Sequence, residues 1–294
     1  GTLNEPLPGY IGYKDLGELK AVLKNGYMPT PFEAMQLGSG YSLEVPVYAC
    51  DLISAARGVP KRRGLLNPNK RSAWLEGRSC VWRDNGVWDV DPATDRPRLL
   101  RPDHFAAADF GALYVDFARM YIDAVRAAGH PDWACFVELP PADLGLCEFP
   151  HIEPDALPGC VHAPHWYDQL TLYLGRFIPW CAFDVQTGEP ALGRDGVRRQ
   201  HTRQVLELAA LSTSHMGGVP TFIGEFGIPF SLNGREAYVK GTLDGCTAAL
   251  DSSVSVLEAA GVSYALWCYA PEHCAKWGDL WNREDLSIYS KETA

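Results

Sequence analysis

Residues 220–226, with the sequence PTFIGEF, are the stretch on which the fold prediction rests. They form a short apolar run that contains Glu225 near its end, and Gly227 and Pro229 follow it. A continuous apolar run of this length is typical of a strand that is buried on both faces, as in a parallel sheet. A carboxylate at the end of such a strand is costly to bury unless it has a purpose. For Glu225 taken alone, a structural carboxylate that pairs with a cation is the alternative.

Segments of alternating type surround this strand. Apolar runs predict further strands over residues 133–139, 160–164 and 262–269. Helical spacing predicts helices over residues 110–128, 196–216 and 233–260, the last as one or two helices. The apolar positions of the first helix are Leu113, Phe117, Met120, Tyr121 and Val125. Strands that alternate with helices indicate an α/β fold with a parallel sheet.

Residues 14–110 contain few periodic segments and no clear helix. The sequence of residues 42–49 predicts a short strand. Because this strand contains Pro46, we expect it at the edge of a sheet. Residues 81–90 predict a hairpin around Asp84, Asn85 and Gly86. The segment is too long for an ordinary connection, so we expect an elaborated functional loop or lid.

Composition excludes several classes of partner. The 294 residues include 26 basic and 36 acidic ones, and the net charge of −10 argues against a nucleic acid or an anionic membrane as the main partner. No apolar run is long enough for a transmembrane segment. The nine cysteines are scattered, without a CxxC pair, and predict free thiols in a reducing compartment. We therefore expect an intracellular location, in the cytoplasm or a vacuole.

The informative polar and aromatic residues share one place, the carboxyl end of a predicted strand. They are Glu5, Glu138, His165, Tyr167, Glu225, Trp267 and Tyr269. In parallel α/β folds this edge is where active sites are built.

Taken in order, these positions resemble family 5 of the retaining glycoside hydrolases. The matching motifs are Asn4-Glu5-Pro6, His165-x-Tyr167, Gly224-Glu225-Phe226-Gly227 and Trp267. Residues 9–13 (GYIGY) and 277–288 (WGDLWNREDLSI) resemble the fungal endoglycoceramidase-related branch, whose members cleave β-glucosides of lipids, glucosylceramide or steryl glucosides. The resemblance implies a (β/α)8 TIM barrel and a hydrolase that acts on a glycolipid without a metal or a cofactor.

The resemblance also implies the catalytic pair. Glu5 matches the general acid/base, and Glu225 matches the nucleophile that forms a glycosyl-enzyme. Retention requires one protonated and one ionised carboxyl group, about 5–5.5 Å apart. Two strand ends across the mouth of a barrel are able to supply that separation.

The remaining matches imply substrate-binding roles. Asn4 matches the residue that hydrogen-bonds the 2-hydroxyl of the sugar, and Tyr167 matches the phenol that orients the nucleophile. His165 matches the imidazole near the acid/base, and Trp267 matches the aromatic platform under the sugar. Trp277 and Trp281 lie in a loop-like stretch, and we expect at least one of them at the rim of the active site.

In the family, an Arg and a His come from strands that precede the Asn-Glu-Pro turn, which here lies at positions 4–6. We therefore expect residues 1–294 to form the C-terminal part of a barrel, with only the tip of strand 4 and strands 5 to 8 present. Residues 14–110 are then an insertion after strand 4. The upstream half of the barrel is an expected partner, and the isolated chain is expected to be unstable or inactive.

Other classes of protein remain to be weighed. A metal hydrolase with His162, His165, Glu138 and His151 is disfavoured because the histidines flank a strand end rather than a helix. A serine hydrolase is disfavoured because no Gly-x-Ser-x-Gly motif follows a strand. A non-catalytic glycolipid-binding or carbohydrate-binding fragment stays open, and so does the choice between ceramide and sterol.

Overall fold

A computed structural model describes residues 25–26, 29–49, 62–106, 108–138, 149–153, 155–184, 187, 189–280 and 284–292. The chain divides into two units, each with its own core. The first unit comprises residues 1–109 and 144–146, and the second comprises residues 110–143 and 147–294.

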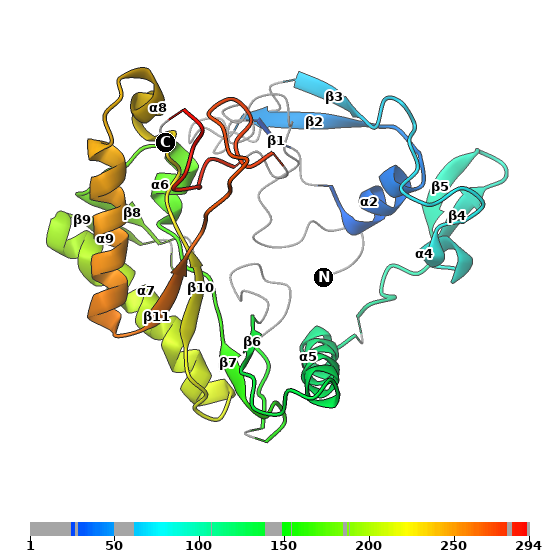
Figure 1. Cartoon of the computed structure of the whole chain (residues 1–294). Coiled ribbons are helices and arrows are strands. Elements are labelled where there is room, and N and C mark those ends of the chain that lie inside the picture. The colour runs from blue at the N-terminus through cyan, green and yellow to red at the C-terminus, as the bar shows by residue number, and fades with distance from the viewer. Residues whose placement is uncertain are drawn as a thin grey trace. The chain divides into compact units, whose positions relative to one another are not determined.

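The second unit is built on parallel strands that follow one another in chain order (Figure 1). β6 (Cys135–Val137) pairs with β7 (Cys160–His162). β7 leads to β10 (Phe222–Phe226) through parallel bridges that join His162 to Thr221 and His165 to Glu225. β10 in turn pairs with β11 (Ser263–Leu266). Each parallel strand therefore lies beside the next one along the chain, as in successive βαβ units.

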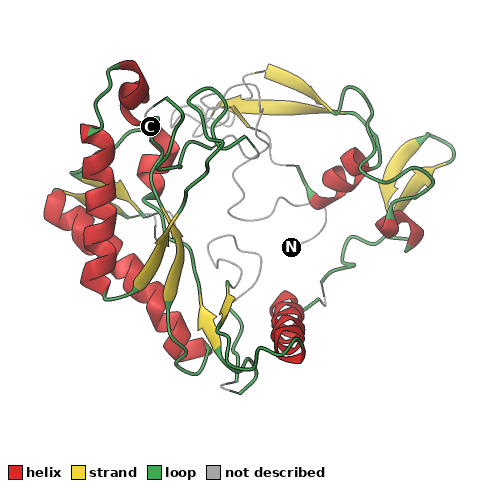
Figure 2. Ribbon diagram, in the orientation of Figure 1, coloured by secondary structure: helices red, strands yellow, loops and turns green. Residues whose placement is uncertain are grey.

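Helices cover one face of these strands (Figure 2). α7 (Arg194–His215) and α9 (Asp244–Ala260) pack together against β10 and β11. The buried members of this cluster are Trp166, Val205, Ile223, Phe226, Val256 and Leu257. α5 (Phe110–Ala127) packs against β6 and β7 through a second cluster, which includes Ala118, Ile122, Cys135 and Val137.

Shorter elements complete the second unit. α6 (Gln169–Leu174) and the antiparallel hairpin of β8 (Cys181–Phe183) and β9 (Pro190–Leu192) lie in the connection between β7 and α7. α8 (Leu232–Val239) precedes α9. In the described part of the chain, no helix is both long enough and apolar enough to cross a membrane.

The first unit is antiparallel. β1 (Asn25–Gly26), β2 (Leu43–Ala49) and β3 (Arg62–Leu66) form one sheet in that order. The unit also contains two helices, α2 (Pro31–Gly38) and α4 (Val81–Asp84), and an antiparallel hairpin of β4 (Trp88–Asp91) and β5 (Arg96–Leu99). Its buried core residues are Met35, Cys80, Val87 and Trp88.

Two predictions for this region are wrong. Residues 31–38 form a helix, which begins with a capping box between Thr30 and Glu33 and has a proline in its first turn. The expected hairpin over residues 81–90 lies instead at residues 88–99. The turn forms there because the side chain of Asp91 accepts hydrogen bonds from the backbone of Ala93 and Thr94.

The strand expected over residues 42–49 is confirmed as β2, but β2 is the middle strand of its sheet rather than an edge. Pro46 lies opposite Arg63 of β3. Among the described residues, β1 pairs only with Tyr48 and Ala49, so the missing N–H of Pro46 interrupts no hydrogen bond to β1.

In the second unit, the predicted helices are confirmed, the last one as α8 and α9. The apolar positions whose spacing predicted α5 are largely exposed, and they include Leu113, Phe117, Met120 and Tyr121. Ala118 and Ile122 face the strands instead. The α/β class with parallel strands is confirmed, whereas the described residues contain no closed barrel.

Gly227 tests how tightly the ends of β10 and β11 pack. A Cβ atom at this position would overlap the carbonyl oxygen of Trp267 and lie 3.6 Å from Leu286. We expect Gly227→Ala to lower the free energy of unfolding by about 1–3 kcal/mol, as measured by urea denaturation. The matched control is Gly196→Ala on α7, where a Cβ atom has no neighbour within 4 Å and a small gain is expected. Equal stability of the two variants would contradict this packing.

Candidate active site

Four of the predicted site residues come together at the carboxyl ends of the parallel strands. His165 and Tyr167 follow β7, Glu225 lies in β10, and Trp267 directly follows β11. The predicted residues Asn4, Glu5 and Trp281 lie outside the described residues.

The side chains of residues 165–167, which follow β7, alternate between the site and the core, as in a strand. The backbone N–H of Trp166 donates to the carbonyl of Glu225 at 3.0 Å. The indole of Trp166 is buried and donates to Gln204 of α7 at 3.1 Å. His165 and Tyr167 therefore project to the opposite side, where their polar atoms meet the carboxylate of Glu225.

A bulge in β10 brings Glu225 to that side. Ile223 pairs with Tyr264 and Phe226 pairs with Leu266, so β10 has one extra residue over this interval. Both Ile223 and Phe226 are buried toward α7 and α9. The bulge therefore allows Phe226 to stay in the core while Glu225 turns toward His165 and Tyr167.

Gly224 permits β7 and β10 to approach at the same point. Its N–H donates to the carbonyl of Pro164 at 2.9 Å. A Cβ atom there would lie 3.1 Å from the carbonyl oxygen of Ala163 and 3.3 Å from the ring of His165. A larger residue at position 224 would therefore displace the imidazole.

One oxygen of Glu225 receives two polar neighbours. The hydroxyl of Tyr167 donates to Oε2 at 2.9 Å, and Nδ1 of His165 lies 3.2 Å from the same atom. Burial and the charge of Glu225 raise the pKa of Tyr167 far above its ordinary value, so the phenol stays protonated and remains a donor. Both contacts orient the carboxylate of Glu225.

Glu138 is a further member of the site, although the sequence predicted no catalytic or substrate-binding role for it. It directly follows β6, and its Oε1 lies 3.3 Å from Nδ1 of His165. The imidazole therefore lies beside two carboxylates. Burial raises the pKa of Glu138, the imidazole opposes this effect, and the charge of Glu225 adds to it. The position of Glu138 at the end of a predicted strand is the sequence signal that could have identified it as a site residue.

The motif stretch after β11 is anchored beside the site. The N–H of Cys268 donates to the carbonyl of Leu286 at 3.1 Å, and the N–H of Ile288 donates to the carbonyl of Cys268 at 3.0 Å. The charge of Glu284 contributes to raising the pKa of Tyr167 and of Cys268, after burial as the main cause. Glu284 is therefore electrostatically coupled to the site.

A buried carboxylate holds the same stretch in place. Asp285 accepts a hydrogen bond from Tyr238 at 2.7 Å and lies 2.8 Å from Nε2 of His273, which is fully buried. Burial raises the pKa of Asp285, while Tyr238 and His273 oppose this shift. The network links α8 to the loop that carries Glu284.

The two described tryptophans of the prediction differ in their surroundings. The N–H of Trp267 donates to the carbonyl of Phe226 at 2.8 Å, which places Trp267 at the end of β10. Trp277 is exposed, and Nζ of Lys276 lies 4.7 Å from the centroid of its ring. A place for Trp277 at the rim of the site stays a prediction.

His162 belongs to the core rather than to the site. Its Nδ1 lies 2.8 Å from Oγ of Ser212, and burial lowers its pKa to about 4, so it stays neutral. Over the ranges that the structure describes, no group of three His, Cys, Asp or Glu side chains is arranged to hold a metal ion. The described site therefore brings together two carboxylates, an imidazole and a phenol, with the backbone of Trp267 at the end of β10.

This set of groups suits nucleophilic chemistry at an acetal carbon. Glu225 is oriented through one oxygen by two neighbours, which leaves a carboxylate in fixed geometry. Burial is the main cause of the raised pKa of Glu138, and the charge of the neighbouring Glu225 adds to it.

Several known proteins are similar in sequence to this chain over nearly its whole length, although no protein-family model matches it. It is 28% identical to the ergosteryl-beta-glucosidase of Saccharomyces cerevisiae, over 99% of this chain and 42% of the relative. It is 30% identical to a glucosylceramidase of Aspergillus fumigatus, over 98% of this chain and 42% of the relative.

A solved structure shows the same likeness. The crystal structure of Cryptococcus neoformans sterylglucosidase 1 with tris matches 95% of this chain, with a TM-score of 0.73 and 25% identity, and 41% of the solved chain is covered. The chain thus spans less than half the length of the relatives it matches.

Removal of the Tyr167 hydroxyl tests its hold on Glu225. We expect Tyr167→Phe to lower kcat about 10- to 100-fold with little change in KM, because a hydrogen bond to a charged group contributes about 1.5–3 kcal/mol. Steady-state kinetics of the full-length enzyme on a chromogenic β-glucoside provide the measurement. Tyr264→Phe, whose ring packs on Phe226, is the matched control and should keep its kcat. An unchanged kcat in Tyr167→Phe would remove the phenol from this role.

Neutralisation of Glu138 should stabilise the fold at neutral pH. Because the folded protein holds this proton more tightly than the unfolded chain, stability falls as the pH rises from the ordinary value of 4.5 through the raised pKa. The side chain is 40% exposed, so screening by solvent limits the expected gain of Glu138→Gln to less than about 1 kcal/mol at neutral pH. Below the ordinary value the gain should fade.

Thermal unfolding at acidic and neutral pH measures this difference. Glu258→Gln, at an exposed position of α9, is the matched control and should unfold at neutral pH as the wild type does. A Glu138→Gln variant that is less stable than the wild type at neutral pH would show that its contact with His165 outweighs the cost of burial.

Proposed function

We propose that the chain belongs with the fungal steryl-glucoside and glucosylceramide hydrolases of glycoside hydrolase family 5, and that it carries the nucleophile of a retaining β-glycosidase. The substrate is the β-glucosidic bond of a glycolipid, a steryl glucoside or glucosylceramide. The observation that carries the proposal is the placement of Glu225 between Tyr167 and His165 at the ends of the parallel strands.

The proposed reaction is a double displacement. A carboxylate oxygen of Glu225 attacks the anomeric carbon, the bond from that carbon to the lipid oxygen breaks, and the general acid protonates the departing oxygen. Water then attacks the glycosyl-enzyme, the same residue accepts its proton, and Glu225 is released. Family resemblance assigns the acid/base role to Glu5.

The groups around Glu225 have supporting roles in this scheme. Tyr167 and His165 hold Oε2, which keeps the carboxylate aligned with the anomeric carbon. Trp267 supplies the platform under the sugar, and Asn4 binds the 2-hydroxyl. Trp277 and Trp281 border the entrance for the lipid.

We assign β6, β7, β10 and β11 to strands 5 to 8 of a (β/α)8 barrel. Their parallel pairing in chain order supports this assignment. Phe136 is 53% exposed on the face of β6 opposite to α5, and the exposed apolar stripe of α5 lies at the same end of the strand order. Further strands and helices of a barrel would cover both surfaces.

Residues 14–110 form a lid that shapes the groove for the lipid in this proposal. The boundary between the two units, after Asp109, supports a separate role for this region. The seven cysteines that the structure describes are free thiols, which supports an intracellular location.

Replacement of the nucleophile tests the proposed function. In the full-length enzyme, we expect Glu225→Gln to lower hydrolysis of both a chromogenic β-glucoside and a lipid glucoside by at least about a thousandfold, with an unchanged melting temperature. The matched control is Glu207→Gln, a surface residue paired with Arg203, which should keep full activity.

Two outcomes would overturn the proposal. Full activity of Glu225→Gln would remove Glu225 from the nucleophile role. A full-length wild-type protein that binds lipid glucosides without hydrolysing them would indicate a carbohydrate-binding function instead.

A further inference from the structure

The hairpin of β8 and β9 has one buried and one exposed face. Ala182 and Ala191 lie opposite each other and pack against Val197 of α7. Side chains alternate along each strand, and paired residues share a face. The neighbouring pairs, Cys181 with Leu192 and Phe183 with Pro190, therefore lie on the outer face.

This outer face is apolar and open. Leu192 is 69% exposed and Phe183 is 41% exposed. Trp180 is also exposed at the base of the hairpin, where its carbonyl accepts a hydrogen bond from the N–H of Gly193. Exposed apolar clusters on a rigid element commonly mark a binding surface.

The hairpin is fixed to α7. The buried carboxylate of Asp184 accepts a hydrogen bond from Arg203 at 2.9 Å, and the N–H of Asp184 donates to the carbonyl of Glu189 at 2.9 Å. The amide of Gln200 donates to the same carbonyl at 3.0 Å. The apolar face is therefore held in place by contacts on its other side.

The outer face of the hairpin differs in location from the exposed apolar face of α5. The hairpin lies in the connection between β7 and α7, and β7 already has β6 on one side and β10 on the other. A further strand of the sheet would therefore not cover the hairpin. We therefore consider a partner other than a neighbouring strand for its apolar face.

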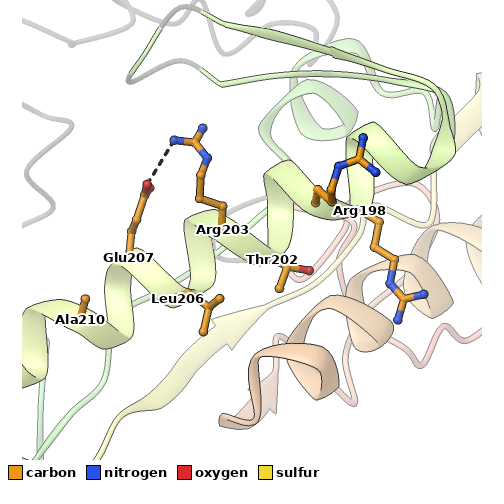
Figure 3. A pocket seen from close by; sticks show the side chains of 7 residues that line it. Arg198, Thr202, Arg203, Leu206, Glu207 and Ala210 are labelled. Atoms are coloured by element: carbon orange, nitrogen blue, oxygen red, sulfur yellow. Dashed lines mark hydrogen bonds and ion pairs between the residues drawn. The ribbon is translucent and has the colours of Figure 1, made fainter.

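Arginine side chains project from α7, the helix on which the inner face of the hairpin packs (Figure 3). A surface pocket of about 550 Å³ is lined by Arg198, Arg199, Thr202, Arg203, Leu206, Glu207 and Ala210. Arg203 connects this pocket to the hairpin through Asp184, and it also pairs with Glu207 at 3.1 Å. None of the residues assigned to the active site lines the pocket.

The cations of the pocket exceed its anions. Arg203 is neutralised by Asp184 and Glu207, whereas Arg198 and Arg199 are exposed and have no carboxylate within ion-pair distance among the residues described. The exposed acidic residues nearby are Glu189 and Asp195. In a chain with a net charge of −10, such a cluster beside an apolar face is a local exception.

We propose that the outer face of the hairpin and the arginine face of α7 dock onto a phospholipid membrane that contains anionic lipids. Phe183, Leu192 and Trp180 would enter the boundary between headgroups and acyl chains. Arg198 and Arg199 would pair with lipid phosphates. A membrane with anionic lipids offers both acyl chains for the apolar side chains and phosphates for the arginines. A purely apolar or purely acidic protein surface would match only one of the two.

Vesicle flotation measures the proposed docking directly. The wild-type protein should float with phosphatidylcholine vesicles that contain phosphatidylserine and bind more weakly to phosphatidylcholine alone. Added salt should weaken the binding, because it screens the charged contacts. Absence of binding to either kind of vesicle would overturn the proposal.

Two variants separate the charged and apolar contributions. Arg198→Glu with Arg199→Glu should weaken binding to the anionic vesicles at least about fivefold for each arginine. Phe183→Ser with Leu192→Ser should weaken it about tenfold or more. The matched controls are Arg98→Glu on β5 and Val239→Ser at the exposed end of α8, both of which should bind as the wild type does.

The arginine pair is exposed on a helix, so its loss should not disturb folding, and unchanged thermal unfolding of that variant checks this point. Binding by both variants at wild-type strength would overturn the proposal. A variant that abolishes self-association rather than vesicle binding would overturn it in favour of a second copy of the chain. Hydrolysis of a soluble β-glucoside is the separate test of the proposed function, and vesicle binding does not depend on its result.

Discussion

The backbone hydrogen bonds between residues 162–166 and 220–225 set the register on which the candidate active site depends. The N–H groups of His162, Gly224 and Trp166 donate in turn to the carbonyls of Pro220, Pro164 and Glu225. A slip of one residue would turn His165 and Tyr167 toward α7 and bring Trp166 to the site. The bulge in β10 then allows Phe226 to remain in the core beside Glu225. Chemistry and packing are thus separated by the pleat of adjacent strands.

The site concentrates charge that the fold must hold in place. Glu138 and Glu225 both approach Nδ1 of His165, and burial raises the pKa of Glu138. Such an arrangement disfavours ionisation and lowers stability at neutral pH. The apolar cluster of β10, β11, α7 and α9 lies behind the same strands and supplies the opposing stabilisation. A reactive group on rigid, well-packed strands is the usual way to keep catalytic geometry fixed.

Much of the second unit could be predicted from the sequence, because helical spacing and apolar runs are local signals. The strand-end positions of His165, Tyr167, Glu225 and Trp267 followed from those signals. The bulge, the contact of Glu138 with His165 and the buried face of α5 could not be predicted, since they depend on pairing between distant segments. In the first unit, the capping box at Thr30 was a readable signal for α2, whereas the true hairpin turn depends on a side chain of Asp91.

Covalent trapping tests the central claim most directly, namely that Glu225 is the group held ready to attack the anomeric carbon. A 2-deoxy-2-fluoro β-glucoside with a good leaving group slows the second step of a retaining enzyme and allows the glycosyl-enzyme to accumulate. Proteolysis and mass spectrometry then locate the modified carboxylate. The account predicts one fluoroglucosyl adduct on the peptide that contains Glu225. An adduct on Glu138 or another carboxylate, or turnover without any adduct, would contradict it.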